Sequence, residues 1–240
     1  MTQQKGVALL LVLWVLALLS ILLAGLAGWV QLESREALWE RQHTEAILAA
    51  EAGINLAVVG LTDPAQRLAW GADGRPHSLA FERTQVQVSV FSERGKLDLN
   101  AASADDFAHL LQACGGASHA RELAQALEQR RGNGQPPLRV IEELRQLPGM
   151  NQALFACMAP NVTLWSGQER PDPVFATPLL QRVMSLPNLK ISGGADPGPI
   201  LTLYSVAQLP SGFSATLAVT LLLNPSTEGA RPYRVLHWQE

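Results

Sequence analysis

The residues best suited to chemistry in this 240-residue chain are two cysteines, five histidines and a scatter of carboxylates. Cys114 and Cys157 lie too far apart in the sequence to form a CxxC metal or redox motif. In an oxidising compartment they are a candidate disulfide, whereas in a reducing compartment they are two buried free thiols. The sequence leaves both interpretations open, because it does not give the distance between the two Cα atoms.

The histidines do not fall into a metal-binding pattern, since no two of them form an HxxxH or HExxH pair. They are His43, His77, His109, His119 and His237. The sequence also lacks a GxSxG, P-loop or GxGxxG motif, and it presents no nucleophile with its general base. We therefore predict that the protein is not an enzyme.

Carboxylates and amides gather near one predicted loop, where their oxygens would suit a hard cation such as calcium. The group comprises Asp98, Asn100, Asp105 and Asp106, with Asp172 and Asp196 in other loops. Their spacing does not match an EF-hand. Solvated side chains and helix caps explain the same residues, so the metal ligands stay unknown and no residue is assigned to calcium.

Composition excludes several classes of protein. The chain is 48% hydrophobic and 16% charged, with a net charge of −3 and two cysteines. A disordered chain would be less apolar, and a disulfide-dense scaffold would hold more cysteine. Its three lysines are Lys5, Lys96 and Lys190. This charge balance argues against a basic nucleic-acid-binding protein.

The charges are unevenly distributed, because Lys5 is the only charged residue before Glu33. Residues 7–30 form an uncharged apolar run, which as a helix would be roughly 36 Å long and would cross a membrane. The lysine before the run favours a cytoplasmic N-terminus. A cleaved secretory signal is the alternative, but its apolar region is usually only about 7–15 residues long.

The segment after this run favours one continuous helix. Residues 31–58 contain apolar side chains at spacings of three and four, and no proline precedes Pro64. A helix over residues 7–58 would be about 78 Å long, and only its second half can pack on a globular head.

The remaining sequence predicts strands on both sides of a helical block. Residues 84–92 alternate polar and apolar, and residues 200–207, 213–223 and 233–238 also read as strands, with turns at 210–212 and 224–226. Helices are predicted at residues 104–114, 119–131, 140–147, 151–158 and 178–186. We therefore predict an α+β fold, with a long N-terminal helix packed on an antiparallel sheet and an inserted all-helical subdomain.

The N-terminus resembles that of type IV pilin-like proteins. The resemblance rests on a short leader ending in Lys5-Gly6, the apolar run, and an amphipathic continuation containing residues 49–53, AAEAG. It implies that a prepilin peptidase cuts between Gly6 and Val7 and then methylates the amine of Val7. Most members of this family carry a glutamate at the fifth mature position, where this chain has Leu11.

A missing fifth-position glutamate and an inserted helical subdomain together resemble the K-type minor pseudopilin of type II secretion. The resemblance implies a non-enzymatic subunit at the tip of the pseudopilus that supports export of folded proteins across the outer membrane. Its expected partners are the I- and J-type minor pseudopilins, the pseudopilus, the prepilin peptidase, and the secretin or a secreted substrate. The family is associated with calcium, but we expect no cofactor here.

The same resemblance implies a single-pass protein of the bacterial inner membrane, with its N-terminus in the cytoplasm and its head in the periplasm. Its expected parts are a leader (residues 1–6), a transmembrane helix (7–30) and the periplasmic half of that helix (31–58). A pilin-like head would follow at 59–101 and 198–240, with the helical insertion at 102–197.

Two alternatives remain. Residues 97–103 and 143–150 resemble a helix-hairpin-helix module, in which the Pro148-Gly149 turn would present backbone amides to a DNA phosphate. The chain would then be a membrane-anchored DNA receptor of the competence type. The acidic Glu142 and Glu143 oppose this function, so we expect no nucleic-acid partner. The other alternative is a single-pass anchored protein of unrelated function.

Overall fold

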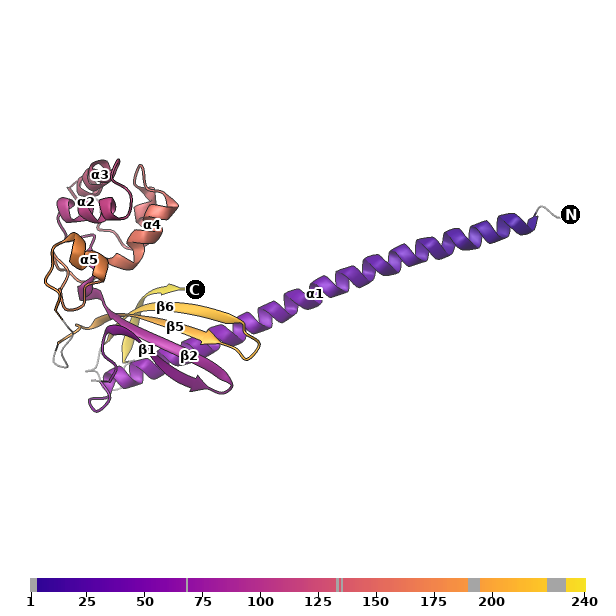
Figure 1. Cartoon of the computed structure of the whole chain (residues 1–240), viewed down its shortest axis with the longest axis horizontal. Helices are drawn as coiled ribbons and strands as arrows, with labels where there is room; N and C mark the ends of the chain where they lie inside the picture. The colour runs from indigo at the N-terminus through magenta and orange to yellow at the C-terminus, as the bar shows by residue number, and fades with distance from the viewer. Residues whose placement is uncertain (1–3, 68, 133, 135, 190–194, 224–231) are drawn as a thin grey trace.

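The computed structural model describes residues 4–67, 69–132, 134, 136–189, 195–223 and 232–240. One helix, α1 (Gln4–Thr62), runs from the N-terminus to the far end of the head. At about 1.5 Å per residue it is roughly 88 Å long. Figure 1 shows its first half extending away from the head and its second half lying against the sheet. The prediction of one continuous helix is thus confirmed.

The second half of α1 packs on the sheet through a face of small and branched residues. Ala49, Ala50 and Ala57 are buried on this face, together with Ile54. Gly53 lies so close to the sheet that an added Cβ would come within 2.6 Å of a Val86 methyl carbon. The small side chains therefore set the short distance between helix and sheet.

The sheet has five antiparallel strands in the order β1-β2-β5-β6-β7. The strands are β1 (Asp73–Phe81), β2 (Thr84–Ser92), β5 (Ile200–Gln208), β6 (Ser214–Leu223) and β7 (Tyr233–Gln239). Val86, Val88 and Val90 on β2 face α1, as the alternation of the sequence predicts. The four predicted strands are confirmed to within one or two residues. The predicted turn at 224–226 lies outside the described residues.

Strand β1 was not expected from the sequence. It contains Gly74 and Pro76, which weaken a strand signal. β1 is an edge strand and pairs only with β2, so the missing N–H of Pro76 can be tolerated at this position. Pairing with a strong neighbouring strand therefore overrides the weak local preference.

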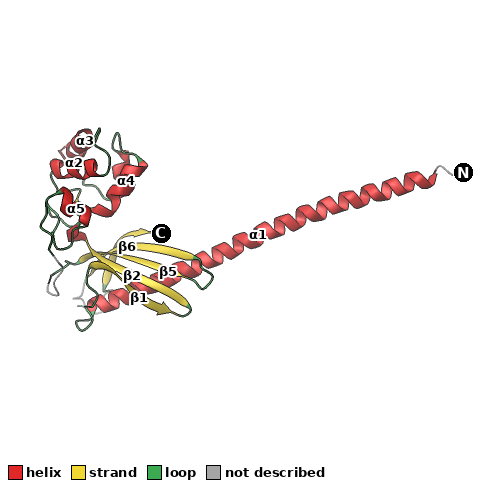
Figure 2. Ribbon diagram, viewed as in Figure 1, coloured by secondary structure: helices red, strands yellow, loops and turns green. Residues whose placement is uncertain are grey.

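Between β2 and β5 the chain forms a separate helical subdomain, which lies over the end of the sheet farthest from the N-terminus (Figure 2). Its longer helices are α2 (Ala104–Ala113), α3 (Ala120–Gly132), α4 (Gln152–Met158) and α5 (Pro178–Val183). Its short elements are η1 (Glu93–Gly95), β3 (Leu97–Asp98), η2 (Ile141–Gln146), η3 (Ala159–Asn161) and β4 (Val162–Thr163). β3 and β4 pair in parallel, which ties the start of the subdomain to its middle.

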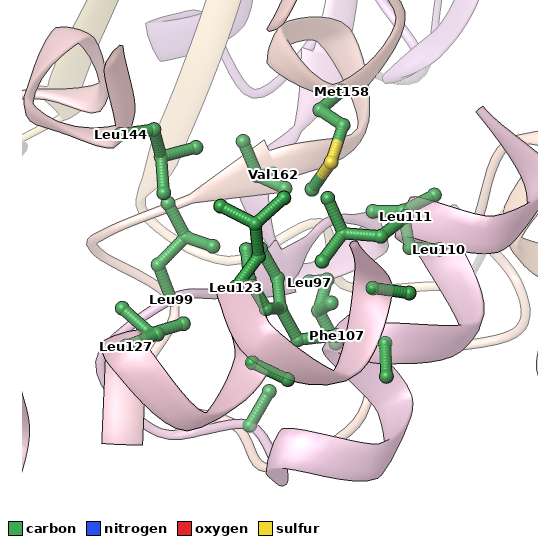
Figure 3. Close-up of a cluster of buried hydrophobic side chains, with 14 of the residues drawn as sticks. Leu97, Leu99, Phe107, Leu110, Leu111, Leu123, Leu127, Leu144, Met158 and Val162 are labelled. Carbon is green, nitrogen blue, oxygen red and sulfur yellow. The ribbon is translucent and has the colours of Figure 1, made fainter. Parts of the chain in front are cut away.

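The subdomain has its own hydrophobic core. Figure 3 shows Phe107 and leucines of α2 and α3 meeting Leu144, Met158 and Val162 from later segments. The helices begin at capping residues: the side chains of Ser103, Asn151 and Thr177 each accept a hydrogen bond from a backbone N–H. Because this core is distinct from the one under α1, the head consists of two packed units.

The structure corrects two of the predicted helices. Residues 141–146 form a 3₁₀ helix rather than an α-helix. The Glu143 side chain folds back to accept hydrogen bonds from the amides of Arg139 and Val140, and Pro148 follows closely, so an α-helix has little room to extend. The last predicted helix is also shorter, because α5 ends at Val183.

Candidate assembly surface

The first half of α1 exposes a long run of large apolar side chains. Its large apolar side chains are exposed from Leu9 onward: Leu11 is 63% exposed and Trp14 is 71% exposed. The helix is long and apolar enough to cross a membrane. Ser20, within this stretch, donates its hydroxyl to the carbonyl of Leu16 at 2.8 Å, so its polar group is satisfied inside the helix. This half of α1 is therefore suited to lipid or to other apolar helices.

The residues predicted to be processed lie at the start of this helix. Gly6 and Val7 fall in the first turns of α1, while residues 1–3 of the expected leader lie outside the described residues. Small residues occur farther along the apolar stretch. An added Cβ at Gly25 or Gly28 would meet nothing within 4 Å, so these positions leave room for a second helix to approach closely.

An aromatic cluster marks the point where α1 leaves the head. The Trp39 and His43 rings stack with their centroids 5.1 Å apart, and Phe213 meets both rings edge-on at 6.4 Å. Phe213 precedes β6, so the turn between β5 and β6 holds the helix at this point. The aromatic cluster therefore separates the exposed half of α1 from the packed half.

The two cysteines meet inside the helical subdomain. Cys114 follows α2 and Cys157 lies in α4; they form a disulfide with their Cα atoms 5.7 Å apart. The bond joins two helices that otherwise meet only through side-chain packing. The expected effect is to restrict the subdomain to one arrangement of these helices.

Arg131 supports the beginning of the subdomain. Its guanidinium donates to the carbonyl oxygens of Leu99 and Ala102, with Nε 2.8 Å from the Leu99 oxygen. Burial lowers the pKa of Arg131, while the negative charges of Asp98 and Glu128 act in the opposite direction. Arg131 thus joins the C-terminal end of α3 to the loop before α2.

The oxygen-bearing residues near this loop make hydrogen bonds within the protein. Asp98 is buried and accepts hydrogen bonds from the amides of Asn100 and Gly167 and from the Ser166 hydroxyl. The Asn100 side chain donates a hydrogen bond to the carbonyl of Leu138 and accepts one from its amide. Within the described residues, no three His, Cys, Asp or Glu side chains are placed to hold a metal ion.

Three of the other carboxylates that were considered for calcium also make contacts within the protein. Asp106 pairs with Arg170 at 3.6 Å. Asp172 accepts a hydrogen bond from the amide of Val174, and Asp196 pairs with Arg94 at 3.4 Å. These three carboxylates therefore serve in ion pairs or accept a hydrogen bond from a backbone amide.

The Pro148-Gly149 turn is closed by a hydrogen bond from the amide of Met150 to the carbonyl of Leu147 at 3.1 Å. Gly149 has a φ of +90°, which favours glycine, and the turn lies against His119 at the start of α3. Glu143 pairs with Arg130, Glu142 lies 3.5 Å from His237, and the Arg145 guanidinium lies over the Phe155 ring. These contacts give the turn a packing role and do not favour DNA binding.

Hydrogen bonds also affect the ionisation of Glu143. The amide of Arg139 gives the largest effect and, with the amide of Val140 and the charge of Arg130, lowers the pKa of Glu143. The Glu143 side chain therefore favours its charged form in the folded protein.

Comparison with known proteins identifies the fold. A chain in the crystal structure of the GspK-GspI-GspJ complex from the enterotoxigenic Escherichia coli type 2 secretion system is similar, with a TM-score of 0.59. The match covers 83% of this chain and 97% of that chain at 14% sequence identity. No protein-family model matches, and no curated protein matches. The chain therefore has a pseudopilin-like fold, with a long apolar N-terminal helix on a five-stranded antiparallel sheet.

Proposed function

We propose that this protein is a K-type minor pseudopilin of a type II secretion system. The observation that carries the proposal is the helical subdomain inserted between β2 and β5 of a pilin-like sheet. The fold likeness to a chain of the GspK-GspI-GspJ complex supports a pseudopilin role. The DNA-receptor alternative is not favoured, because the acidic Glu142 and Glu143 precede the Pro148-Gly149 turn and would repel a DNA phosphate.

The exposed half of α1 would serve first as an anchor and then as an assembly element. It would hold the precursor across the inner membrane, with the N-terminus in the cytoplasm and the head in the periplasm. A prepilin peptidase would cut between Gly6 and Val7 and methylate Val7. The helix would then pack beside the helices of I- and J-type subunits.

Leu11 gives a physical reason for a position at the tip. A carboxylate inside a membrane needs a partner, which in related subunits would be the terminal amine of a neighbour. Leu11 has no carboxylate, so this chain lacks that link to a subunit above it. The helical subdomain, which lies over the far end of the sheet, would also obstruct further addition.

The proposed role is non-enzymatic and requires no cofactor. The tip would help to initiate the pseudopilus and could meet the secretin or a secreted substrate during export. Calcium remains a family property without assigned residues in this chain. The proposed parts are a leader at 1–6, a membrane helix at 7–30, its periplasmic half at 31–58, the pilin-like head, and an insertion between β2 and β5.

Co-purification tests the proposed partners. The full chain, extracted in detergent with I- and J-type pseudopilins of the same secretion system, should elute with both as one complex. A Gly6→Ala precursor should remain uncleaved and serves as the processing control. Elution of the chain without either partner would contradict the proposal.

A further inference from the structure

The helical subdomain is connected to the sheet by two crossings of the chain, at residues 92–97 and 195–200. The Ser92 hydroxyl donates to the carbonyl of Pro197 at 2.6 Å, and Arg94 pairs with Asp196. A further hydrogen bond joins the amide of Asp172 to the carbonyl of Arg94 at 2.8 Å. The two crossings therefore form one neck rather than two independent linkers.

A buried ion pair lies inside this neck. The side chain of Glu93 is 1% exposed and that of Lys96 is 9% exposed, and Lys96 Nζ lies 2.5 Å from Glu93 Oε1. Glu93 Oε2 is also buried and has no hydrogen-bond partner among the described residues. The pair therefore sits in a place where water contributes little to its solvation.

The ion pair is anchored on the two central strands of the sheet. The Thr202 hydroxyl lies 2.5 Å from Glu93 Oε1 and 3.3 Å from Lys96 Nζ, and Thr202 Oγ1 is 2.8 Å from Thr220 Oγ1. Thr202 lies on β5 between Leu201 and Leu203, which pack toward α1. Because side chains alternate along a strand, the ion pair sits on the sheet face opposite α1.

A second contact reaches the same face. His237 on β7 pairs with Thr220 across the sheet, and its Nε2 lies 3.5 Å from Glu142 Oε1 in the subdomain. Its ring centroid lies 6.3 Å from that of Trp165. The subdomain is thus held at the neck and at β7, and Phe175 also packs against the core between α1 and the sheet. Of the two charged contacts, the one at the neck is the more deeply buried.

Buried ion pairs are weak sources of net stability, since desolvation offsets much of their attraction. Their geometry is restrictive, because a displaced partner leaves an uncompensated charge away from water. Because Glu93 and Lys96 lie three residues apart in one turn, the restraint comes from their contact with Thr202, which fixes this turn on β5. The pair is therefore better suited to fixing an orientation than to raising stability.

We propose that Glu93 and Lys96 are positioning residues that fix the direction of the helical subdomain over the sheet. This inference rests on the proposed function, in which the subdomain must overhang the tip to obstruct a further subunit. The positioning residues contact no partner themselves and act through the orientation of the subdomain.

The orientation can be measured between two spin labels on the full chain in detergent. Thr216→Cys on β6 and Gln129→Cys on α3 provide exposed labelling sites, while Cys114 and Cys157 remain disulfide-bonded. The otherwise unaltered protein should give one narrow distance distribution. Replacing both charges, as Glu93→Gln with Lys96→Met, should broaden it by about twofold, because the neck no longer imposes one arrangement.

Two further variants separate positioning from general stability. Thr202→Val keeps both charges but removes their anchor, so it should broaden the distribution to a smaller extent. Arg170→Met with Asp106→Asn removes an ion pair that lies wholly within the subdomain, and it should leave the width unchanged. An unchanged width in the neck variants would overturn the proposal, even if their thermal midpoints fell.

The distance measurement is made on the isolated chain, so it does not depend on the role of the protein in a fibre. If the distance distribution stays narrow after the charges of Glu93 and Lys96 are removed, the positioning proposal is wrong and the tip assignment is unaffected. If labelled protein occurs along the whole length of the fibres, the tip assignment is wrong and the positioning proposal is unaffected.

Discussion

The exposed half of α1 and the helical subdomain contain similar apolar residues but differ in whether those residues are buried. Both are rich in leucine, yet the leucines of α1 before residue 40 are exposed, whereas Leu110, Leu123 and Leu144 are fully buried. The subdomain can close its core because its helices are short and turn back on one another. Among the described residues, no other helix or strand lies beside the first half of α1 (Figure 1), so its apolar surface is available to lipid or to another helix.

This difference in exposure distinguishes the region that presents apolar surface from the region that gives the head its shape. Within the described subdomain the exposed large apolar side chains are Val140 and Leu189. Its outer surface is therefore mostly polar, as expected of a part that meets water. Exposed large apolar side chains are thus concentrated on α1. In the proposed function α1 would supply the apolar contacts of assembly, and the subdomain would supply bulk and direction.

The largest effect should follow from opening a cavity in the subdomain core. Leu123→Ala should destabilise the subdomain by about 2–5 kcal/mol, because Leu123 is fully buried. Denaturant unfolding of the full chain in detergent would measure the change. Leu22→Ala, at an exposed position of α1, is the matched control and should leave head stability unchanged. Equal losses in the two variants would break the contrast between the regions.

Removal of the disulfide should have the next largest effect. Replacing Cys114 and Cys157 with alanine should lower subdomain stability by roughly 2–4 kcal/mol, because the unfolded chain gains freedom. Hydrogen exchange should then increase in α2 and α4 but not in β5 and β6. Faster exchange throughout the sheet would mean that the subdomain and sheet unfold as a single unit.

The two halves of α1 can be compared with one substitution. Gly53→Ala should destabilise the head by about 1–3 kcal/mol, because the added methyl would overlap Val86 and Ser205. Gly25→Ala has free space and should leave the head unchanged. Thermal unfolding followed by circular dichroism would compare them, and a stabilised Gly53→Ala protein would contradict the packing described here.

The smallest effect concerns pH. Because folding lowers the pKa of Glu143, its contribution to stability is present above the unfolded pKa and is lost as pH falls through the folded pKa. Glu143→Gln should therefore flatten the acid side of the stability profile and change little at neutral pH. Urea midpoints across an acid pH series would measure the slope, and parallel profiles for the two proteins would exclude this contribution.

The sequence predicts most of this architecture because apolar residues recur with the period at which a helix or strand turns one face toward the core. The alternating valines of β2 and the proline-free helix are clear signals that the structure confirms. β1 is hidden by Gly74 and Pro76, since its position depends on pairing with β2. The 3₁₀ form of η2 accompanies two hydrogen bonds from backbone amides to the Glu143 side chain, which periodicity does not reveal.

The candidate sites likewise divide into those that the sequence reveals and those that appear only in the folded structure. The apolar run and Leu11 are visible in the sequence, because a membrane helix is a local property. Glu93 and Lys96 resemble ordinary surface charges until the fold brings Thr202, more than 100 residues away, beneath them. Long-range contacts of this kind have no signature in a single sequence.

The location of the protein in assembled fibres tests the central claim most directly. Gold labelling of an exposed head residue, viewed by electron microscopy, should place the protein at one end of each pseudopilus. A Leu11→Glu variant regains the carboxylate and should also occur along the fibre. Equal labelling of the unaltered protein along the whole fibre would contradict the assignment to the tip.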